Sequence, residues 1–267
     1  MSNLIAIANE TKKITRNGCY DMDGHTIRFP QTDLSAVKVY TPEEGLALCA
    51  KYEGADGTVP AFEITTEDSF QAARRFEHPL VMNFANAHHP GGGFEIGATA
   101  QEESLCRCST LFASLKSEAA KEMYRYNNAH RSGVESDYML LSDPVYVFRN
   151  ERYELLDKPV PVGVITLPAP NRNGLAMFTT SEKLEAAMTK RLRIMAAVAK
   201  ENGFRSLILG AWGCGAFRND PVKVAGYFKK VLLEEKFGAY FDSICFAIYG
   251  KEDGKNITAF REVLETD

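Results

Sequence analysis

Two acidic residues follow a glycine-rich loop in the first half of the chain. Three consecutive glycines, Gly91 to Gly93, are separated by seven residues from the run Gln101, Glu102 and Glu103. Glycine backbone can adopt positive φ and approach a ligand closely. Free N–H groups in such a loop, and at the start of the helix that follows, favour an anion. A nearby anion raises the pKa of a carboxyl, as a general acid requires near neutral pH. The spacing therefore predicts acid–base chemistry beside an anionic ligand.

A second glycine loop follows a short apolar run, Ser206 to Leu209, which we predict to be a buried strand. The loop comprises Gly213, Cys214, Gly215, Ala216 and Phe217. Its backbone N–H groups could face a phosphate. A dinucleotide-binding loop of the Rossmann kind would need G-x-G-x-x-G opening a helix. Here Trp212 interrupts the pattern and the next helix is predicted to begin only at Asp220. We therefore favour a second phosphate-facing loop.

From Leu80 onward, predicted strands alternate with predicted helices, which indicates a sheet covered by helices on both faces. The expected strands span residues 79–84, 139–141, 145–148, 162–167, 206–209 and 243–249, and the expected helices span 105–115, 117–130, 181–202, 221–236 and 256–264. Residues 79–267 are the predicted catalytic core. Residues 1–78 are predicted to form a mostly helical N-terminal extension packed on that core. In it, Thr41 to Glu44 has the pattern of a capping box with proline at the first helical position.

Charge and cysteine usage narrow the choice of partner and compartment. The net charge is −4, and the lysines and arginines are spread without a basic tract of the nucleic-acid kind. We see no secretory signal and no apolar run near the length of a membrane span. The six cysteines are therefore expected to be reduced thiols of a cytoplasmic protein rather than a disulfide framework. We expect a monomer that does not associate with membranes.

A metal site is the alternative interpretation of the residues around the first glycine loop. His88 and His89 precede the glycines, and Cys106 and Cys108 follow the acids. The C-x-C spacing has no second paired motif, unlike zinc sites, and Cys108 falls on the apolar face of its predicted helix. We therefore expect His88 and His89 to be loop histidines that line the mouth of the binding cleft, and we expect no metal site and no cofactor.

Three separated elements resemble, in the same order, the signature of poly(ADP-ribose) glycohydrolases. They are the segment Phe84-Ala85-Asn86, the glycine triplet with its spaced Gln101-Glu102-Glu103, and the loop Gly210 to Phe217 (GAWGCGAF). The regions around them are similar to the shorter, bacterial-type branch of the family. The resemblance implies an α/β fold of the macrodomain kind, with three α/β/α layers and a mixed central sheet.

The resemblance also implies roles for individual residues. Consecutive residues of a helix diverge by about 100°, so two adjacent carboxylates cannot act at one point. The family pattern assigns catalysis to Glu103, binding of a ribose hydroxyl to Glu102, and orientation of the same ribose to Asn86. Gln101 belongs to the same substrate-binding signature. The diphosphate would lie between the Gly91, Gly92 and Gly93 loop and the Gly213–Phe217 loop, with Phe217 along the diphosphate and terminal ribose. Without the resemblance, the two acids are also typical of a first helical turn, and Phe217 could be a core residue.

The expected function is hydrolysis of ribose–ribose O-glycosidic bonds in poly(ADP-ribose), with release of ADP-ribose from chain ends. Two other functions use the same glycine loops. One is hydrolysis of mono-ADP-ribose attached to protein or nucleobase. The other is non-catalytic binding of ADP-ribose, which has no need of Glu103. The expected partners are ADP-ribose, its polymer and ADP-ribosylated macromolecules.

Overall fold

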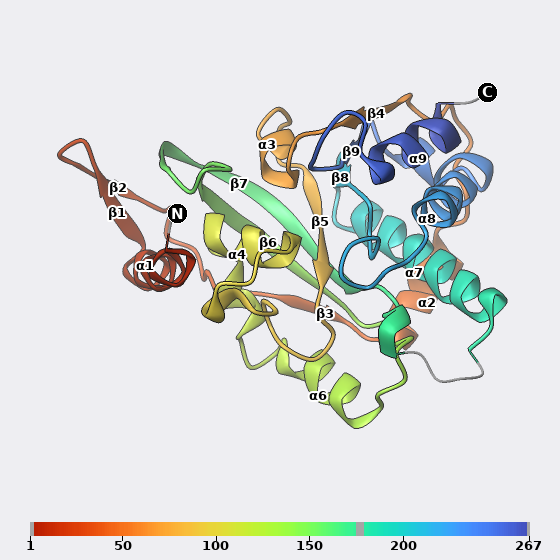
Figure 1. Cartoon of the computed structure of the whole chain (residues 1–267), viewed down its shortest axis with the longest axis horizontal. Helices are drawn as coiled ribbons and strands as arrows, with labels where there is room; N and C mark the ends of the chain where they lie inside the picture. The colour runs from red at the N-terminus through yellow and green to blue at the C-terminus, as the bar shows by residue number, and fades with distance from the viewer. Residues whose placement is uncertain (1–2, 175–178, 266–267) are drawn as a thin grey trace.

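The computed structural model describes residues 3–174 and 179–265. In this part of the chain, seven strands form one mixed sheet in the order β3-β6-β7-β5-β8-β9-β4 (Figure 1). The strands are β3 Lys38–Tyr40, β4 Phe62–Thr65, β5 Leu80–Ala85, β6 Met139–Arg149, β7 Leu155–Pro168, β8 Ser206–Leu209 and β9 Ser243–Ala247. The pairs from β7 through β5, β8 and β9 to β4 are parallel, whereas β3–β6 and β6–β7 are antiparallel.

Helices cover both faces of this sheet, so the fold has the predicted three layers (Figure 1). The first face carries α1 Leu4–Asn17, α3 Ser69–Ala73, α4 Gln101–Cys108, α5 Leu111–Leu115 and α6 Lys121–Ala129, and the second carries α2 Pro42–Lys51, α7 Ser181–Glu201, α8 Pro221–Phe228 and α9 Lys255–Leu264. Successive strand residues point to opposite faces. Accordingly, Leu80 and Met82 join the core under α7 and α8, whereas Val81 joins the core under α4 and α5. The predicted α/β/α architecture with a mixed sheet is confirmed.

The first 78 residues supply parts of the main sheet as well as a separate hairpin. Strands β3 and β4 form the two edges of the main sheet. Strands β1 Cys19–Met22 and β2 His25–Arg28 pair only with each other. A small aromatic core, which includes Tyr20, Phe29 and Phe148, packs the base of this hairpin against β6. The division at residue 78 remains a prediction, and the main sheet contains strands from both sides of it.

Several element boundaries differ from the sequence-based ones. The helix expected over 105–115 is two helices, because Ser109 is extended (φ −148°) and makes a bridge to Val147 of β6. The strands expected at 139–141 and 145–148 are one strand with an irregularity between Ser142 and Val145. The helix expected to reach residue 236 changes at Lys229 to a π-helical segment, η3 Lys229–Glu234. Short 3-10 helices are also present at η1 Phe94–Ile96, η2 Arg172–Gly174 and η4 Phe237–Tyr240.

Helix α2 begins as its sequence predicts. Thr41 Oγ1 accepts from the backbone N–H of Glu44, and the Glu44 carboxylate accepts from the backbone N–H of Thr41.

Across the described ranges, none of the helices combines the length and apolar character that crossing a bilayer requires.

Candidate active site

Both glycine loops and both predicted carboxylates meet at the carboxyl ends of the parallel strands. A cleft of about 550 Å³ lies there, at the position where open α/β sheets bind ligands. Eight of the predicted site residues line it: Asn86, Gln101, Glu102, Glu103, Gly213, Gly215, Ala216 and Phe217. The other four, Gly91, Gly92, Gly93 and Cys214, do not line the cleft directly.

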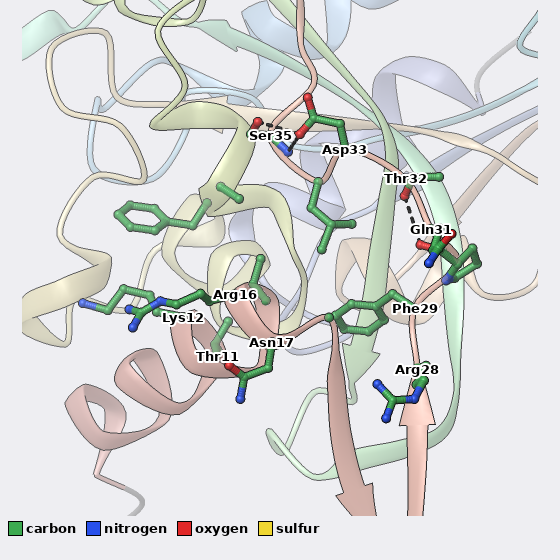
Figure 2. Close-up of a pocket in the computed structure, with 16 residues that line it drawn as sticks. Thr11, Lys12, Arg16, Asn17, Arg28, Phe29, Gln31, Thr32, Asp33 and Ser35 are labelled. Carbon is green, nitrogen blue, oxygen red and sulfur yellow. Dashed lines mark hydrogen bonds between the residues drawn. The ribbon is translucent and has the colours of Figure 1, made fainter.

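A larger hollow of about 710 Å³ lies elsewhere, between α1, the 28–35 segment and the start of α5 (Figure 2). Its lining includes Lys12, Arg16, Arg28 and Phe29, and none of the predicted site residues. We place the candidate site in the smaller cleft because the paired carboxylates are there.

Glu102 is a buried residue, and its carboxyl is hydrogen-bonded to neighbouring protein groups. Its side chain is 2% exposed. Its Oε2 accepts from the backbone N–H of Asn86 at 2.7 Å, and its Oε1 accepts from Asn83 Nδ2 at 3.4 Å. Burial raises the pKa of the Glu102 carboxyl to about 8, and the hydrogen bonds from Asn86 and Asn83 act in the opposite direction. Because desolvation disfavours the charged form, burial favours the protonated form of Glu102.

Glu103 has one bound oxygen and one unbound oxygen. Oε1 accepts from the backbone N–H of Gly93 at 2.8 Å. Oε2 is buried and has no hydrogen-bond partner among the described residues. A buried oxygen without a partner is rare in proteins and calls for an explanation such as a ligand or a catalytic role. Since Glu103 also lines the cleft, Oε2 is the carboxyl atom of the pair that is left for a ligand.

The glycine triplet lets the loop lie directly on these carboxylates. Gly91 and Gly92 have positive φ, 69° and 54°. A Cβ on Gly91 would stand 2.8 Å from the Phe112 ring, and one on Gly93 would stand 2.7 Å from the Cβ of Ala98. Side chains at Gly91 and Gly93 would therefore collide with Phe112 and Ala98, so the fold of the loop requires glycine at these positions.

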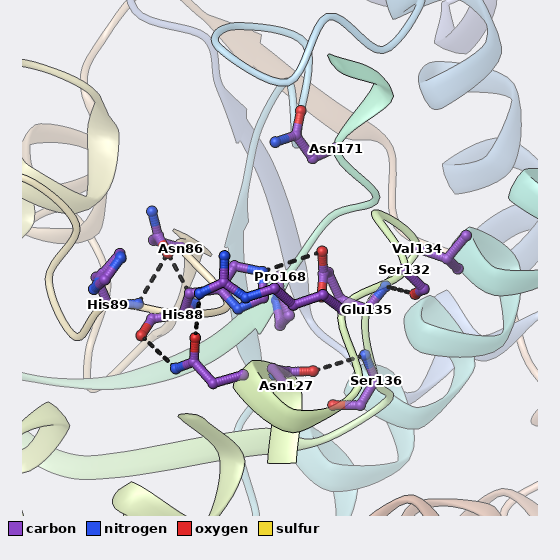
Figure 3. Close-up of polar contacts among 12 residues, drawn as sticks. Asn86, His88, His89, Asn127, Ser132, Val134, Glu135, Ser136, Pro168 and Asn171 are labelled. Carbon is purple, nitrogen blue, oxygen red and sulfur yellow. Dashed lines mark hydrogen bonds and ion pairs between the residues drawn. The ribbon is translucent and has the colours of Figure 1, made fainter. Parts of the chain in front are cut away.

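Asn86 organises the start of the same loop with its side chain. Its Oδ1 accepts from the backbone N–H of His88 at 2.9 Å and of His89 at 3.0 Å (Figure 3). Its own backbone N–H binds Glu102. Asn86 thus connects the loop to the buried acid, and it also lines the cleft.

Gln101 binds the end of strand β5 through both ends of its amide. Its Oε1 accepts from the backbone N–H of Phe84 at 2.9 Å. Its Nε2 donates to Met82 O at 2.8 Å and to Ser69 Oγ at 3.0 Å. These bonds fix the first turn of α4 to the strand, so they hold the two acids that follow Gln101.

The second glycine loop presents a crowded glycine and an open one. Gly213 has φ 73°, and a Cβ there would stand 2.6 Å from Asn219 Nδ2. Nothing lies within 4 Å of a Cβ built on Gly215. Cys214 Sγ lies 3.7 Å from Trp212 O and its side chain packs against the main core. Phe217 is partly buried against the same core and its ring borders the cleft.

Sequence patterns did not identify several residues of this site. Asn83 and Thr166 form a fully buried polar pair under Glu102, with Asn83 Nδ2 3.1 Å from Thr166 Oγ1. Their only sequence signal is a polar residue inside an apolar strand. The cleft is also lined by Ser69, Phe70, Tyr249 and Asn256. No sequence motif marks these residues.

The residues of the alternative zinc interpretation are dispersed. Cys106 and Cys108 are buried in the core under α4, and neither histidine lines the cleft. Within the described part of the chain, no cluster of three or more His, Cys, Asp or Glu side chains could hold a metal ion. That the protein acts without metal remains a prediction.

The fold and the site together define a macrodomain-like α/β protein, with a carboxyl pair held beneath a glycine loop at the carboxyl edge of its sheet. The family model described as "Microbial-type PARG, catalytic domain" matches residues 8–150. The chain belongs to the microbial-type poly(ADP-ribose) glycohydrolase family.

Solved structures of bacterial relatives are similar over nearly the whole chain. The poly(ADP-ribose) glycohydrolase from Thermomonospora curvata is 35% identical, with a TM-score of 0.91, over 98% of this chain and 99% of that one. The same enzyme bound to the inhibitor ADP-HPD is 34% identical, with a TM-score of 0.89 and the same coverage. The enzyme from Deinococcus radiodurans in complex with ADP-ribose is 36% identical, with a TM-score of 0.79, over 90% of this chain and 98% of that one. A search of curated proteins found no match.

Proposed function

We propose that this protein hydrolyses ribose–ribose O-glycosidic bonds of poly(ADP-ribose) and releases ADP-ribose from chain ends. The observation that carries the proposal is the division between the two acids. Glu102 is bound by Asn86 and Asn83, whereas Glu103 lines the cleft and its buried Oε2 has no hydrogen-bond partner among the described residues. The named substrate of the similar bacterial enzymes, and the ADP-ribose and ADP-HPD complexes of two of them, agree with this proposal.

In the proposed mechanism Glu103 is the catalytic residue and acts first as an acid. Its proton passes to the oxygen of the leaving ribose as the bond from that oxygen to the anomeric carbon breaks. The bonding electron pair stays with the leaving oxygen, and an oxocarbenium-like centre forms. Most glycosidases place a second carboxylate near this centre. Here the substrate's own diphosphate would supply the negative charge, because burial raises the pKa of Glu102 and so favours its neutral form.

The same residue then acts as a base. The Glu103 carboxylate takes a proton from a water molecule as the water oxygen bonds to the anomeric carbon. This returns Glu103 to its protonated form and leaves free ADP-ribose. The bond from Gly93 N–H to Oε1 keeps the carboxyl oriented through both steps, which preserves Oε2 for the substrate.

The surrounding residues are proposed to bind the ADP-ribose unit. The open face over Gly215 leaves room for a phosphate against the loop backbone. Phe217 would lie along the diphosphate and terminal ribose, and Asn86 and Glu102 would bind that ribose. We assign Gln101 to positioning, because its amide is bound to β5 and Ser69.

Location and assembly are part of the proposal. All six cysteines are free thiols, the form expected in a reducing compartment, so we propose a cytoplasmic protein. We also propose that it acts as a monomer, which sedimentation analysis can check.

The decisive experiment compares substrates. Purified protein is incubated with poly(ADP-ribose), with mono-ADP-ribosylated protein and with ADP-ribosylated nucleic acid, and free ADP-ribose is measured by chromatography. Release from polymer at many turnovers is expected. Release only from mono-modified substrates would replace the polymer with that substrate class, and binding of ADP-ribose without any release would make the protein a binding module.

A further inference from the structure

The loop that carries Asn86 and the glycine triplet is contacted by residues that are far away in the sequence. His88 is at the centre of these contacts (Figure 3). Its backbone N–H binds Asn86 Oδ1, and its carbonyl accepts from Asn128 Nδ2 at 3.0 Å. Its ring Nε2 lies 3.3 Å from Glu135 Oε1. The backbone and the ring of His88 therefore connect the loop to two different segments.

Glu135 has an unusual backbone conformation. Its φ is 64°, in the left-handed region that residues other than glycine seldom adopt. Its side chain is only 6% exposed. Such a conformation persists where the surroundings fix it, and it is concentrated at functional sites.

Arg191 of α7 is the group that fixes it. Its Nη2 donates to the carbonyls of Val134 and Glu135, both at 2.7 Å. Its Nη1 donates to Pro168 O at 3.0 Å, at the carboxyl end of β7, the strand beside β5. The Arg191 side chain is 1% exposed and is paired with Asp137. A buried guanidinium thus ties the Glu135 backbone to the sheet edge that forms the site.

Within this part of the protein, the contact between His88 and Glu135 is the main polar contact of each of these two side chains. Glu135 Oε2 and His88 Nδ1 are buried and have no hydrogen-bond partner among the residues described. Among the cations of this region, Lys190 is paired with Asp137 and Arg131 donates to Asn128, whereas the buried Arg191 guanidinium also interacts electrostatically with the Glu135 carboxylate. The Glu135 side chain is therefore paired directly with the His88 ring, through the contact between Oε1 and Nε2.

We propose that His88 and Glu135 are a positioning pair for the reaction. Their contact fixes the loop from Asn86 to Gly93, and this loop donates backbone N–H groups to both acids, including Asn86 to Glu102 and Gly93 to Glu103. The pair does not line the cleft, so it acts through the loop and not on the substrate. This inference rests on the proposed function and names residues that set the geometry of its acid.

Loss of the pair is expected to lower kcat more than it raises KM. The ligand would still be bound by the Gly213–Phe217 side of the cleft, whereas the Glu103 carboxyl would lose its fixed orientation. Misplacement of a reacting group by about 1 Å can cost about 100-fold in rate. We expect kcat to fall about 10- to 100-fold in His88→Ala and in Glu135→Ala, with little change in the Kd of ADP-ribose measured by calorimetry.

The double variant tests whether the two residues act as one unit. If they do, His88→Ala with Glu135→Ala lowers kcat no further than either single change. Glu135→Leu, which keeps the side-chain volume without an acceptor, is the second variant should Glu135→Ala fold poorly. His89→Ala is the matched control: this exposed neighbour makes the same backbone bond to Asn86, and its variant should keep the parent kcat.

Hydrogen exchange of residues 86–93 gives a readout that needs no turnover. Exchange should quicken in both single variants and stay at the parent rate in His89→Ala. Parent-like kcat together with unchanged exchange, or single effects that multiply in the double variant, would overturn the pair. If the parent protein releases no ADP-ribose from polymer, the proposed function fails, and the exchange measurement alone decides whether the pair holds the loop.

Discussion

Gly92 lies directly against the side chain of Glu103. A Cβ built on Gly92 would stand 2.4 Å from Glu103 Oε1 and 3.4 Å from Glu102 Oε2. The residue also has φ 54°. The glycine is therefore required twice, for the backbone conformation and for the approach of the loop to both acids.

Gly92→Ala is expected to displace the Glu103 carboxyl and to destabilise the protein. The left-handed backbone costs a residue with a Cβ about 1–2 kcal/mol, and the overlap adds to this. Turnover on polymer should be lost, and thermal unfolding should occur at lower temperature. Gly215→Ala is the matched control for stability, because its Cβ meets nothing within 4 Å. Equal unfolding temperatures for the two variants would contradict this account of the triplet.

Gln101→Leu tests whether the Gln101 side chain positions the start of α4 or contacts the substrate. The change leaves the backbone N–H of Phe84 without its acceptor and Met82 O without one donor. An unsatisfied buried group costs about 1–3 kcal/mol, so the free energy of unfolding in urea should fall by that order. ADP-ribose affinity of the folded variant should remain close to that of the parent. A large loss of affinity with unchanged stability would instead assign Gln101 to the ligand.

Local patterns in the sequence were sufficient for the elements whose boundaries depend on neighbouring residues. The capping box at Thr41 gives the start of α2 at Pro42, and the apolar run of β8 gives the bounds Ser206–Leu209, as the structure shows. The alternation after Leu80 predicts the covered sheet. The break at Ser109 was not predictable, because it depends on a bridge to Val147, which is remote in the sequence.

The site shows the same limit. Spacing brings Glu102 and Glu103 to the glycine loop, but it cannot say which oxygen is bound and which is free. That difference comes from Asn83 and from the backbone of Asn86 and Gly93. Sequence also treats Gly213 and Gly215 alike, although only Gly213 has positive φ and is crowded. Tertiary contacts, which no local pattern encodes, make these distinctions.

Glu102 is expected to make stability depend on pH. In the folded protein its carboxyl keeps its proton up to about pH 8, against an ordinary pKa of 4.5. Between these values the folded state binds more protons than the unfolded chain, so the free energy of unfolding falls as pH rises through this window. Glu102→Gln cannot titrate, and its stability should decline less over the same range in urea unfolding. An unchanged pH dependence would show that the Glu102 pKa is not raised.

Cleavage from chain ends is expected to be visible in the first products. The partly buried Phe217 segment bounds the cleft beside the second glycine loop, and we expect it to accommodate a terminal unit better than the interior of a chain. Free ADP-ribose should then be the first product on sized polymer, with little change in the longest chains. Oligomers of intermediate length that precede ADP-ribose would indicate internal cleavage.

Glu103→Gln tests the chemical role of the free oxygen. The change keeps the size of the side chain and the acceptor for Gly93 N–H, but it removes the proton that the reaction transfers. General acid–base catalysis contributes typically about 10²–10⁴-fold, and Glu103 is proposed to act in both directions. Turnover on polymer should therefore fall by at least about 100-fold, whereas the Kd of ADP-ribose in calorimetry should change little.

The control for this variant is Glu95→Gln. Glu95 is an exposed acid on η1, near the same loop, and its carboxylate pairs with Lys12. It should keep parent turnover, because its carboxylate does not line the cleft. Retention of parent turnover in Glu103→Gln would remove the acid from the mechanism. A parallel loss of ADP-ribose binding would instead mean that Oε2 holds the ligand without transferring its proton. Only loss of turnover with retained binding fits a carboxyl whose second oxygen is reserved for the scissile bond.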